Sequence, residues 1–359
     1  MKTTITKTLL SMILLFTVLA CSNNDDDTSP IIPDYTTVED FLNEVGFQGS
    51  AFIRKGNTTV LSKGFGMADV DNNIENDPSL VYRIGSMTKA FTAMGLVNLK
   101  RDGLIESYDQ TLSDFDDEFP RGDEITLRQM FTHYSGLPDY IGPIEAAVDE
   151  QNMFFTPEDI YDIIKESAGE DGLLFDPGSN FAYSNSNYLI IGLLIEELTG
   201  MAYDEYIREK VTGPLAMSQT KVGADDIQGT GYAKGYEDGL VVDPYQMDLA
   251  YSAGEFESTI DDLETWADAL MGNSFLSAEE KAEYFAPSYS EDDYFVPGMG
   301  WFTIKIDGTL VYNHGGNIDG FSSMMALLPE TNSVIILLSN VENWSPMNEV
   351  LETLVKNEF

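Results

Sequence analysis

The chain has 359 residues, of which 43% are hydrophobic, and its formal net charge is −42. This length and hydrophobic content suit a globular protein of one or two domains and exclude disorder throughout. The negative charge repels phosphate backbones and anionic lipid surfaces, so the sequence argues against nucleic acid as a partner.

An export signal is predicted over residues 1–20. Lys2 and Lys7 precede the apolar run LLSMILLFTVLA, which is too short to span a bilayer as a helix but fits the hydrophobic region of a secretory signal. The run ends in VLAC, which resembles the lipobox of bacterial lipoproteins, where the cysteine becomes the lipid-modified N-terminus. Cys21 is the only cysteine of the chain and has no disulfide partner in it. We therefore expect an exported lipoprotein of the outer membrane, anchored through Cys21.

A flexible tether is predicted over residues 21–36. Its stretch SNNDDDTSPIIPD is polar, acidic and interrupted by prolines, and it contains too little apolar surface to become ordered by itself. The globular part is therefore expected to cover residues 37–359.

Strand and helix patterns follow one another in the first part of this region. In QGSAFIRKGNTTVLSKGFG, β-forming residues surround the turn Lys55-Gly56-Asn57, which predicts a hairpin. Apolar residues then recur at helical spacing from Ser86 up to the glycine Gly103, a suitable residue just past a helix end. Three later segments also predict helices: TPEDIYDIIKES, NYLIIGLLIEELTG and STIDDLETWADALMGN.

Two further hairpins are predicted near the C-terminus. GMGWFTIKIDGTLVYNHGG turns at Asp307-Gly308, and SSMMALLPETNSVIILLSN turns between Pro329 and Asn332, before a final helical segment NEVLETLVKNEF. Strands at both ends predict one sheet built from distant parts of the chain. We expect a sheet subdomain of about 37–100 and 290–359, with an inserted helical subdomain of about 101–289.

Ser86 and Lys89 are the first candidate catalytic residues. They form S-x-x-K in RIGSMTKAF at a predicted helix start, where positions i and i+3 share a face and bring the amine beside the hydroxyl. Backbone N–H groups at a helix start favour negative charge on an attacking serine. Burial of the lysine would lower its pKa and supply a neutral amine as a base. The motif alone is equally consistent with a helix cap and a solvated lysine.

A second S-x-x-K, SQTK from Ser218 to Lys221, has no apolar helical repeat behind it. It shows that so short a pattern also arises by coincidence.

Two other constellations contain reactive side chains. In FAYSNSNYL, Tyr183 and Asn185 precede an apolar helical run and offer a proton-transfer group and an amide. In NHGGNIDGF, a predicted strand reaches His314, which can supply charge. The glycines Gly315 and Gly316 then let a substrate backbone lie against the strand. A capped loop and a glycine-rich turn are the simpler interpretations.

In this order and at these spacings, SMTK, YSN and HGG resemble the S-x-x-K, Y-x-N and K/H-T/S-G elements of class C β-lactamases and the related DD-peptidases and esterases. ITLRQMFTHYSGLPDY, LLFDPGSNFAYSN, GPLAMSQT and GFSSMMALLPE resemble further stretches of this family. The resemblance covers the chain from Val38 to its C-terminus. It implies an α/β fold with a five-stranded antiparallel sheet flanked by helices, an all-helical subdomain, and a site in the cleft between them.

The resemblance also implies roles. Ser86 would attack an amide or ester carbonyl, Lys89 and Tyr183 would share proton transfer, and Asn185 would hold the acyl-side amide of the substrate. His314 would help polarise Tyr183 or bind an anionic group.

Two backbone N–H groups, those of Ser86 and Asn317, would form the oxyanion hole. A D-Ala-D-Ala-type peptide, a β-lactam, a D-amino-acid amide and a short acyl ester all fit these parts. No cofactor and no metal are expected, and the protein is expected to be a monomer.

Two departures from the family pattern bear on the substrate. Gly315 stands where Thr or Ser is common, which removes a possible hydrogen bond to a substrate carboxylate and argues against penicillin-like and D-Ala-D-Ala substrates. Glu255, in SAGEFEST, replaces a usual glycine near the expected cleft. Placement on the surface is the simpler interpretation, and a cationic or amine-bearing substrate is the alternative.

Three alternative functions compete with this interpretation. A Ser-His-Asp hydrolase has only His133 and His314 available and no G-x-S-x-G elbow, and a zinc enzyme lacks H-E-x-x-H. A catalytically silent, surface-tethered binding protein of the same fold is the third alternative, and the presence of all three motifs argues against it.

Overall fold

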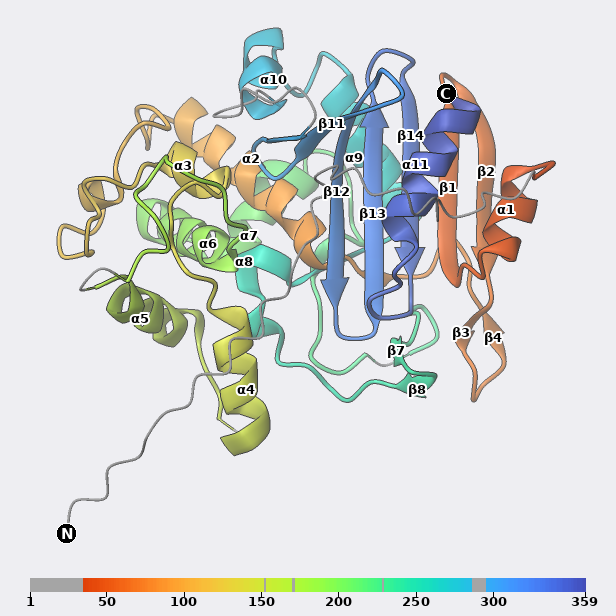
Figure 1. The fold of residues 1–359 in the computed structure, drawn as a ribbon, viewed down its shortest axis with the longest axis horizontal. Coiled ribbons are helices and arrows are strands. Elements are labelled where there is room, and N and C mark those ends of the chain that lie inside the picture. Colours follow the sequence, from red (N-terminus) through yellow and green to blue (C-terminus); the bar gives the residue numbers. More distant parts are fainter. Residues whose placement is uncertain (1–34, 152, 170–171, 228, 286–294) are drawn as a thin grey trace, which may run out of the picture. The chain divides into compact units, whose positions relative to one another are not determined.

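A seven-stranded antiparallel sheet forms the centre of the computed structural model (Figure 1). Its order is β10-β11-β12-β13-β14-β1-β2. The strands are β1 (Gly49–Lys55), β2 (Thr58–Phe65), β10 (Phe295–Pro297), β11 (Phe302–Ile306), β12 (Thr309–Ile318), β13 (Phe321–Leu328) and β14 (Ser333–Ser339).

The structure describes residues 35–151, 153–169, 172–227, 229–285 and 295–359. The predicted export signal over 1–20 and the lipid anchor at Cys21 lie outside these residues and stay predictions. Within them, no helix combines the length and the apolar character needed to cross a bilayer.

The three predicted hairpins are confirmed as β1-β2, β11-β12 and β13-β14. The expected number of five strands is wrong, because these hairpins alone contribute six and the short β10 pairs with β11 at the edge. β1 lies between β2 and β14, with Gly49 opposite Ser339. The sheet is therefore assembled from distant parts of the chain, as predicted.

Alternation along the strands gives the sheet two apolar faces. In β14, Ile335 and Leu337 join the core that contains residues of α1 (Val38–Glu44) and α11 (Met347–Glu358). Ile336 and Leu338 join the larger core on the other face, which is covered by the remaining helices. Figure 1 shows α11 in front of the sheet, near the C-terminal end of the chain.

The larger core surrounds α2, whose residues from Thr88 to Leu99 are all buried. The other helices are α3 (Leu127–Phe131), α4 (Ile141–Gln151), α5 (Pro157–Ala168), α6 (Asn185–Thr199), α7 (Tyr203–Ile207), α8 (Tyr251–Gly254), α9 (Ile260–Met271) and α10 (Ala278–Phe285). The predicted helices are confirmed as α2, α5, α6, α9 and α11. The helix expected from Ser86 begins with a 3-10 turn, Gly85–Met87, before α2 starts at Thr88.

The resemblance implied an all-helical inserted region, and this expectation is wrong. It contains β6 (Lys221–Val222), β7 (Tyr236–Glu237), β8 (Leu240–Val241) and β9 (Phe256–Ser258), while β3 (Met67–Asp69), β4 (Ile74–Glu75) and β5 (Tyr82–Arg83) precede α2. β9 pairs with β5, and the Ile84 N–H donates to the Phe256 carbonyl over 2.9 Å. These strands hold the chain in place just before Ser86.

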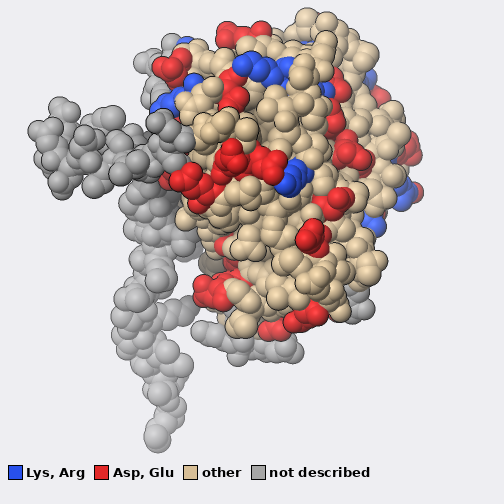
Figure 2. Space-filling view, turned by 90° about the vertical axis from the view of Figure 1, so that its right-hand side faces the viewer, with Lys and Arg blue, Asp and Glu red and all other residues tan. Residues whose placement is uncertain are grey.

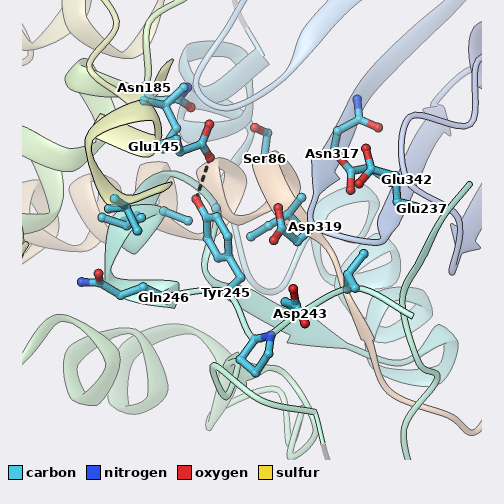
Figure 3. Close-up of a pocket in the computed structure, with 18 of the residues that line it drawn as sticks. Ser86, Glu145, Asn185, Glu237, Asp243, Tyr245, Gln246, Asn317, Asp319 and Glu342 are labelled. Atoms are coloured by element: carbon cyan, nitrogen blue, oxygen red, sulfur yellow. Dashed lines mark hydrogen bonds between the residues drawn. The ribbon is translucent and has the colours of Figure 1, made fainter. Parts of the chain in front are cut away.

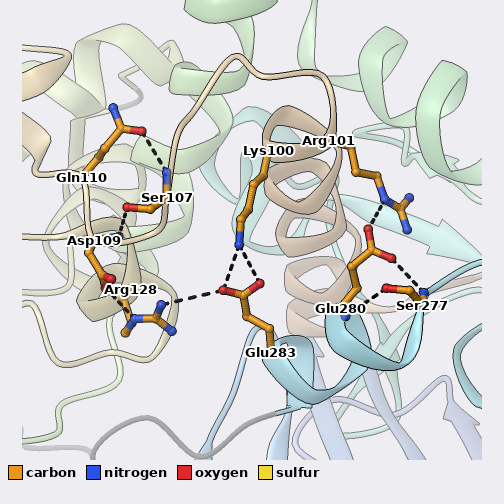
Figure 4. A network of polar contacts seen from close by, with 9 residues as sticks. All are labelled: Lys100, Arg101, Ser107, Asp109, Gln110, Arg128, Ser277, Glu280 and Glu283. Carbon is orange, nitrogen blue, oxygen red and sulfur yellow. Dashed lines mark hydrogen bonds and ion pairs between the residues drawn. The ribbon is translucent and has the colours of Figure 1, made fainter.

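Basic residues near the end of α2 are engaged in ion pairs (Figure 4). Lys100 Nζ lies 3.0 and 2.8 Å from the two carboxylate oxygens of Glu283, and Arg101 pairs with Glu280. Both glutamates belong to α10. Arg128 joins Asp109 at 2.7 Å. This network fastens α10 to the buried helix. Elsewhere the surface is acidic, and the face in Figure 2 shows many Asp and Glu side chains and few Lys and Arg.

β12 passes very close to the turn that precedes α2. A Cβ added to Gly316 would lie 2.0 Å from the Ile84 carbonyl oxygen and 2.9 Å from the Ser86 nitrogen. Gly85, with φ +50°, faces the backbone of Asn317 in the same way, with an added Cβ 3.0 Å from its nitrogen. The two backbones can be this close only because both positions lack side chains.

Replacing this glycine therefore tests the contact. We expect Gly316→Ala to lower the free energy of unfolding by about 1 to 3 kcal/mol, because the methyl group forces β12 away from the turn. Denaturant titration measures the change. Gly231→Ala is the control, since an added Cβ there meets nothing within 4 Å. Equal stability of the two variants would contradict the assignment.

Candidate active site

Ser86 lies at the wall of a pocket of about 740 Å³ (Figure 3). The pocket is bounded by α4, the segment from Glu237 to Ala250, and the end of β12. Figure 3 shows Asn185 on one side of Ser86 and Asn317 on the other. The serine is thus accessible from a cavity large enough for a small-molecule or peptide substrate.

Lys89 is fully buried beside Ser86. Its Nζ lies 3.0 Å from Ser86 Oγ, 2.8 Å from Asn185 Oδ1 and 2.7 Å from the Ala253 carbonyl oxygen. Burial lowers the pKa of Lys89 to about 7, although the negative charge of Asp139 opposes this shift. A neutral amine has two N–H groups, and these donate hydrogen bonds to Asn185 Oδ1 and to the Ala253 carbonyl oxygen. Its lone pair is then directed at the third partner, the Ser86 hydroxyl.

Tyr183 contacts Ser86 from the other side. Its hydroxyl donates to Ser86 Oγ over 2.8 Å. Burial raises the pKa of Tyr183 above its ordinary value, so the phenol stays protonated at neutral pH. The structure therefore gives the two proton-transfer candidates different states, with a tyrosine that donates and a lysine that can accept.

Asn185, the first residue of α6, is positioned by Asp139, which precedes α4. Asp139 Oδ2 accepts from the Asn185 side-chain amide over 2.8 Å and from its backbone N–H over 3.1 Å. Its other oxygen accepts from the Ile141 N–H over 2.9 Å. The carboxylate therefore caps α6, orients Asn185 and contributes negative charge near Lys89. Asp139 was not predicted as a site residue. The signal that could have revealed it is an aspartate two residues before the start of α4, in SGLPDYI.

His314 lies behind the catalytic side chains. Its Nδ1 donates to the Gly315 carbonyl over 2.5 Å, and its ring stacks on Phe302 with centroids 5.1 Å apart. Burial, reinforced by the charge of Lys89, lowers the pKa of His314 to about 3. A neutral imidazole supplies no positive charge, so this burial argues against the expected binding of an anionic group by His314.

His133 is a second positioning residue that the sequence analysis did not single out for this role. It is buried, and its ring stacks on Tyr183 with centroids 4.4 Å apart. Its Nδ1 accepts from the Ser184 N–H over 3.2 Å. Both histidines are thus occupied with backbone groups, while Ser86 contacts the lysine and the tyrosine. This arrangement differs from a Ser-His-Asp triad.

Gly315 and Gly316 of the HGG motif have different structural roles. Gly316 permits the close contact between β12 and the turn at Ser86 described above. Gly315 is half-buried, in a part of β12 beyond the last residue paired with β11, Asn313. Ser86 and Asn317 both line the pocket, and their backbone nitrogens lie on the two sides of the glycine contact. This placement suits an oxyanion hole.

Glu255 and the second S-x-x-K lie apart from the catalytic candidates. Glu255 is only 3% exposed and is not on the surface, and burial raises its pKa well above the ordinary value. It is also outside the pocket lining. Ser218 and Lys221 are exposed, and Lys221 pairs with Glu257 at 3.5 Å. The second S-x-x-K is therefore a structural stretch.

Comparisons with known proteins agree with this fold. A family model described as Beta-lactamase matches residues 36–357. PbpX of Bacillus subtilis (strain 168), named as a penicillin-binding protein, is 29% identical over 317 residues, covering 87% of this chain and 75% of that protein.

Two solved structures share the fold. The octameric penicillin-binding protein homologue from Pyrococcus abyssi has a TM-score of 0.77 at 24% identity, covering 89% of this chain and 76% of that chain. The D-amino acid amidase from Ochrobactrum anthropi SV3, complexed with L-phenylalanine, has a TM-score of 0.76 at 23% identity, covering 89% of this chain and 96% of that chain. Since the family model spans nearly all the described residues, the chain belongs to the beta-lactamase family of serine hydrolases.

Proposed function

We propose that the protein hydrolyses an amide or ester through an acyl-enzyme on Ser86. The observation that carries the proposal is the environment of Lys89. Two acceptors use both N–H groups of a neutral amine, and the third contact, at 3.0 Å, is the serine hydroxyl. With a pKa of about 7, a large share of this amine is unprotonated at neutral pH.

The parts suggest an order of steps. Lys89 accepts the Ser86 proton while Oγ attacks the carbonyl carbon, and the N–H groups of Ser86 and Asn317 stabilise the oxyanion. The tetrahedral intermediate then collapses. Tyr183 donates its proton to the leaving amine or alkoxide and regains one from the Lys89 ammonium. A water molecule then takes the place of the leaving group and attacks the acyl carbon, giving a proton to Tyr183, which passes its own to Lys89. The bond from the acyl carbon to Ser86 Oγ breaks, Lys89 returns the proton to Oγ, and the acid is released.

The relatives support this chemistry without fixing the substrate. One is named for penicillin binding and another for the hydrolysis of D-amino acid amides, and both names involve an amide bond. D-Ala-D-Ala-type peptides, β-lactams, D-amino-acid amides and short esters all remain within the proposed class.

Labelling of Ser86 tests the proposal. We expect a fluorophosphonate to add to the intact protein, as measured by mass spectrometry, and Ser86→Ala to abolish the adduct. The control Ser218→Ala, in the second S-x-x-K, should label normally. No adduct with the unaltered protein would favour a catalytically silent binding protein, and an adduct in Ser86→Ala would remove this serine from its role.

Lys89→Ala tests the base. We expect acylation to slow by at least about 10²-fold, the effect of losing a positioned acid or base. Lys221→Ala should leave the rate unchanged, because Lys221 is exposed and its Nζ pairs with Glu257. The rate of label incorporation measures both. An unaltered rate in Lys89→Ala would refute the base assignment.

The pH dependence follows from the pKa of Lys89. The neutral amine is present above its pKa, so acylation should rise with pH and level off above about pH 7. The negative charge of Asp139 raises this pKa, so Asp139→Asn should move the rise to lower pH. Labelling rates from about pH 5 to 9 measure the midpoint, which lies in this range for groups of such pKa. Asp71→Asn, at an exposed turn, is the control, and a midpoint that moves upward in Asp139→Asn would contradict the assignment.

A further inference from the structure

The pocket in front of Ser86 has a strongly acidic wall (Figure 3). None of the described residues that line it is a lysine or an arginine. Its carboxylates come from α4, from the segment that carries β7 and β8, and from the loops that follow β12 and β14. They are Glu145, Glu237, Asp238, Asp243, Asp319 and Glu342.

Three of these carboxylates are brought together by backbone contacts between separate segments. Gly320, next to Asp319, donates its N–H to Glu342 Oε2 over 3.0 Å. The Glu342 N–H donates in turn to the carbonyl of Tyr236, the residue before Glu237, over 2.9 Å. In Figure 3, Glu237 and Glu342 lie side by side next to Asn317, with Asp319 nearer Ser86. The acidic wall is therefore a fixed part of the pocket.

Two basic side chains stand near the pocket but do not line it. Lys89 stands behind Ser86, and its pKa of about 7 leaves it partly neutral. Arg83 is 2% exposed and donates to the carbonyls of Ala224 and Asp225, and its charge is shared among Asp319, Glu257 and Asp225. One guanidinium thus faces several carboxylates, so the cavity keeps a negative potential.

The groups that would receive a substrate carboxylate are also missing from the third motif. Gly315 has no hydroxyl, and His314 is buried and neutral. An anionic substrate would meet repulsion from the wall without a compensating partner, whereas a cation would find several.

We propose that the acyl donor carries a cationic group, such as an ammonium, which binds against Glu237, Asp319 and Glu342. Apolar side chains in the same pocket, including Ile141, Val148 and Leu249, receive the hydrocarbon part of the substrate. This specificity rests on the proposed function for the bond that is broken. It also predicts cation binding that does not need the nucleophile.

Three esters of matched length differ in the charge of their far end. They are the 4-nitrophenyl esters of 7,7-dimethyloctanoic acid, of 6-(trimethylammonio)hexanoic acid and of adipic acid, which present a neutral, a cationic and an anionic end, and the first two ends have the same shape. At low ionic strength we expect kcat/KM to follow the order cationic, neutral, anionic, with about a tenfold ratio or more between the extremes. Added salt should reduce this ratio, because it screens the wall.

Charge-neutral variants locate the effect. The double variant Glu237→Gln/Glu342→Gln should reduce the ratio of cationic to anionic ester at least about threefold while labelling of Ser86 by a neutral fluorophosphonate stays intact. Glu349→Gln/Glu352→Gln is the matched control, since it removes two exposed carboxylates from α11, away from the pocket lining, and should leave the ratio unchanged.

Binding to the Ser86→Ala protein separates this inference from the proposed function. We expect calorimetry to detect tighter binding of hexyltrimethylammonium than of hexanoate, and the double variant to lose the difference. Ester hydrolysis with equal rates for the three ends, or a preference for the anion, would overturn the inference and leave the serine hydrolase intact. Cation-selective binding without acylation of Ser86 would support the inference and overturn the proposed function. Neither acylation nor selective binding would overturn both.

Discussion

The burial of one amine organises the whole site. Lys89 lies on α2, and its three polar neighbours are Ser86 in the 3-10 turn before this helix, Asn185 on α6 and Ala253 on α8. A charged lysine is poorly solvated there, so the fold itself favours the neutral amine that the proposed base requires. The helices must meet closely enough to exclude water yet leave two oxygens facing the amine. This requirement explains why α2 is buried on all sides, which is unusual for a helix of a globular protein.

A second constraint connects the sheet to this helical core. β12 approaches the turn before α2 so closely that Gly316 has no room for a Cβ, and Ser323 Oγ on β13 donates to the Ile84 carbonyl over 2.8 Å. These contacts place Asn317 beside Ser86, so that two N–H groups separated by more than half the chain lie at one cavity. Movement of the sheet relative to α2 would alter the distance between the Ser86 and Asn317 N–H groups of the proposed oxyanion hole, whereas the contacts of Lys89 are made within the helical core.

Much of the fold was predictable because local patterns agreed with the final structure. Asp307-Gly308 marks a hairpin in any context, and the apolar spacing after Ser86 and Asn185 specifies helices that end in glycine. The site was predictable only through the joint order of three weak motifs. Asp139 and His133 were missed because their roles come from tertiary contacts, a helix cap formed from another segment and a ring stacked on Tyr183, which leave no periodic signal. The neutrality of His314 likewise depends on burial, which no short motif reveals.

The six wall carboxylates come from α4, from β7 and from turns and loops, whereas Ser86 and Lys89 lie at the start of α2 and Tyr183 lies just before α6. The proposed reactivity and the proposed selectivity thus belong to separate stretches of the sequence. Substitutions in the loops can retune which molecules enter without disturbing the machinery that cleaves them. The substrate range of such enzymes can therefore change during evolution while the reaction that they catalyse stays the same.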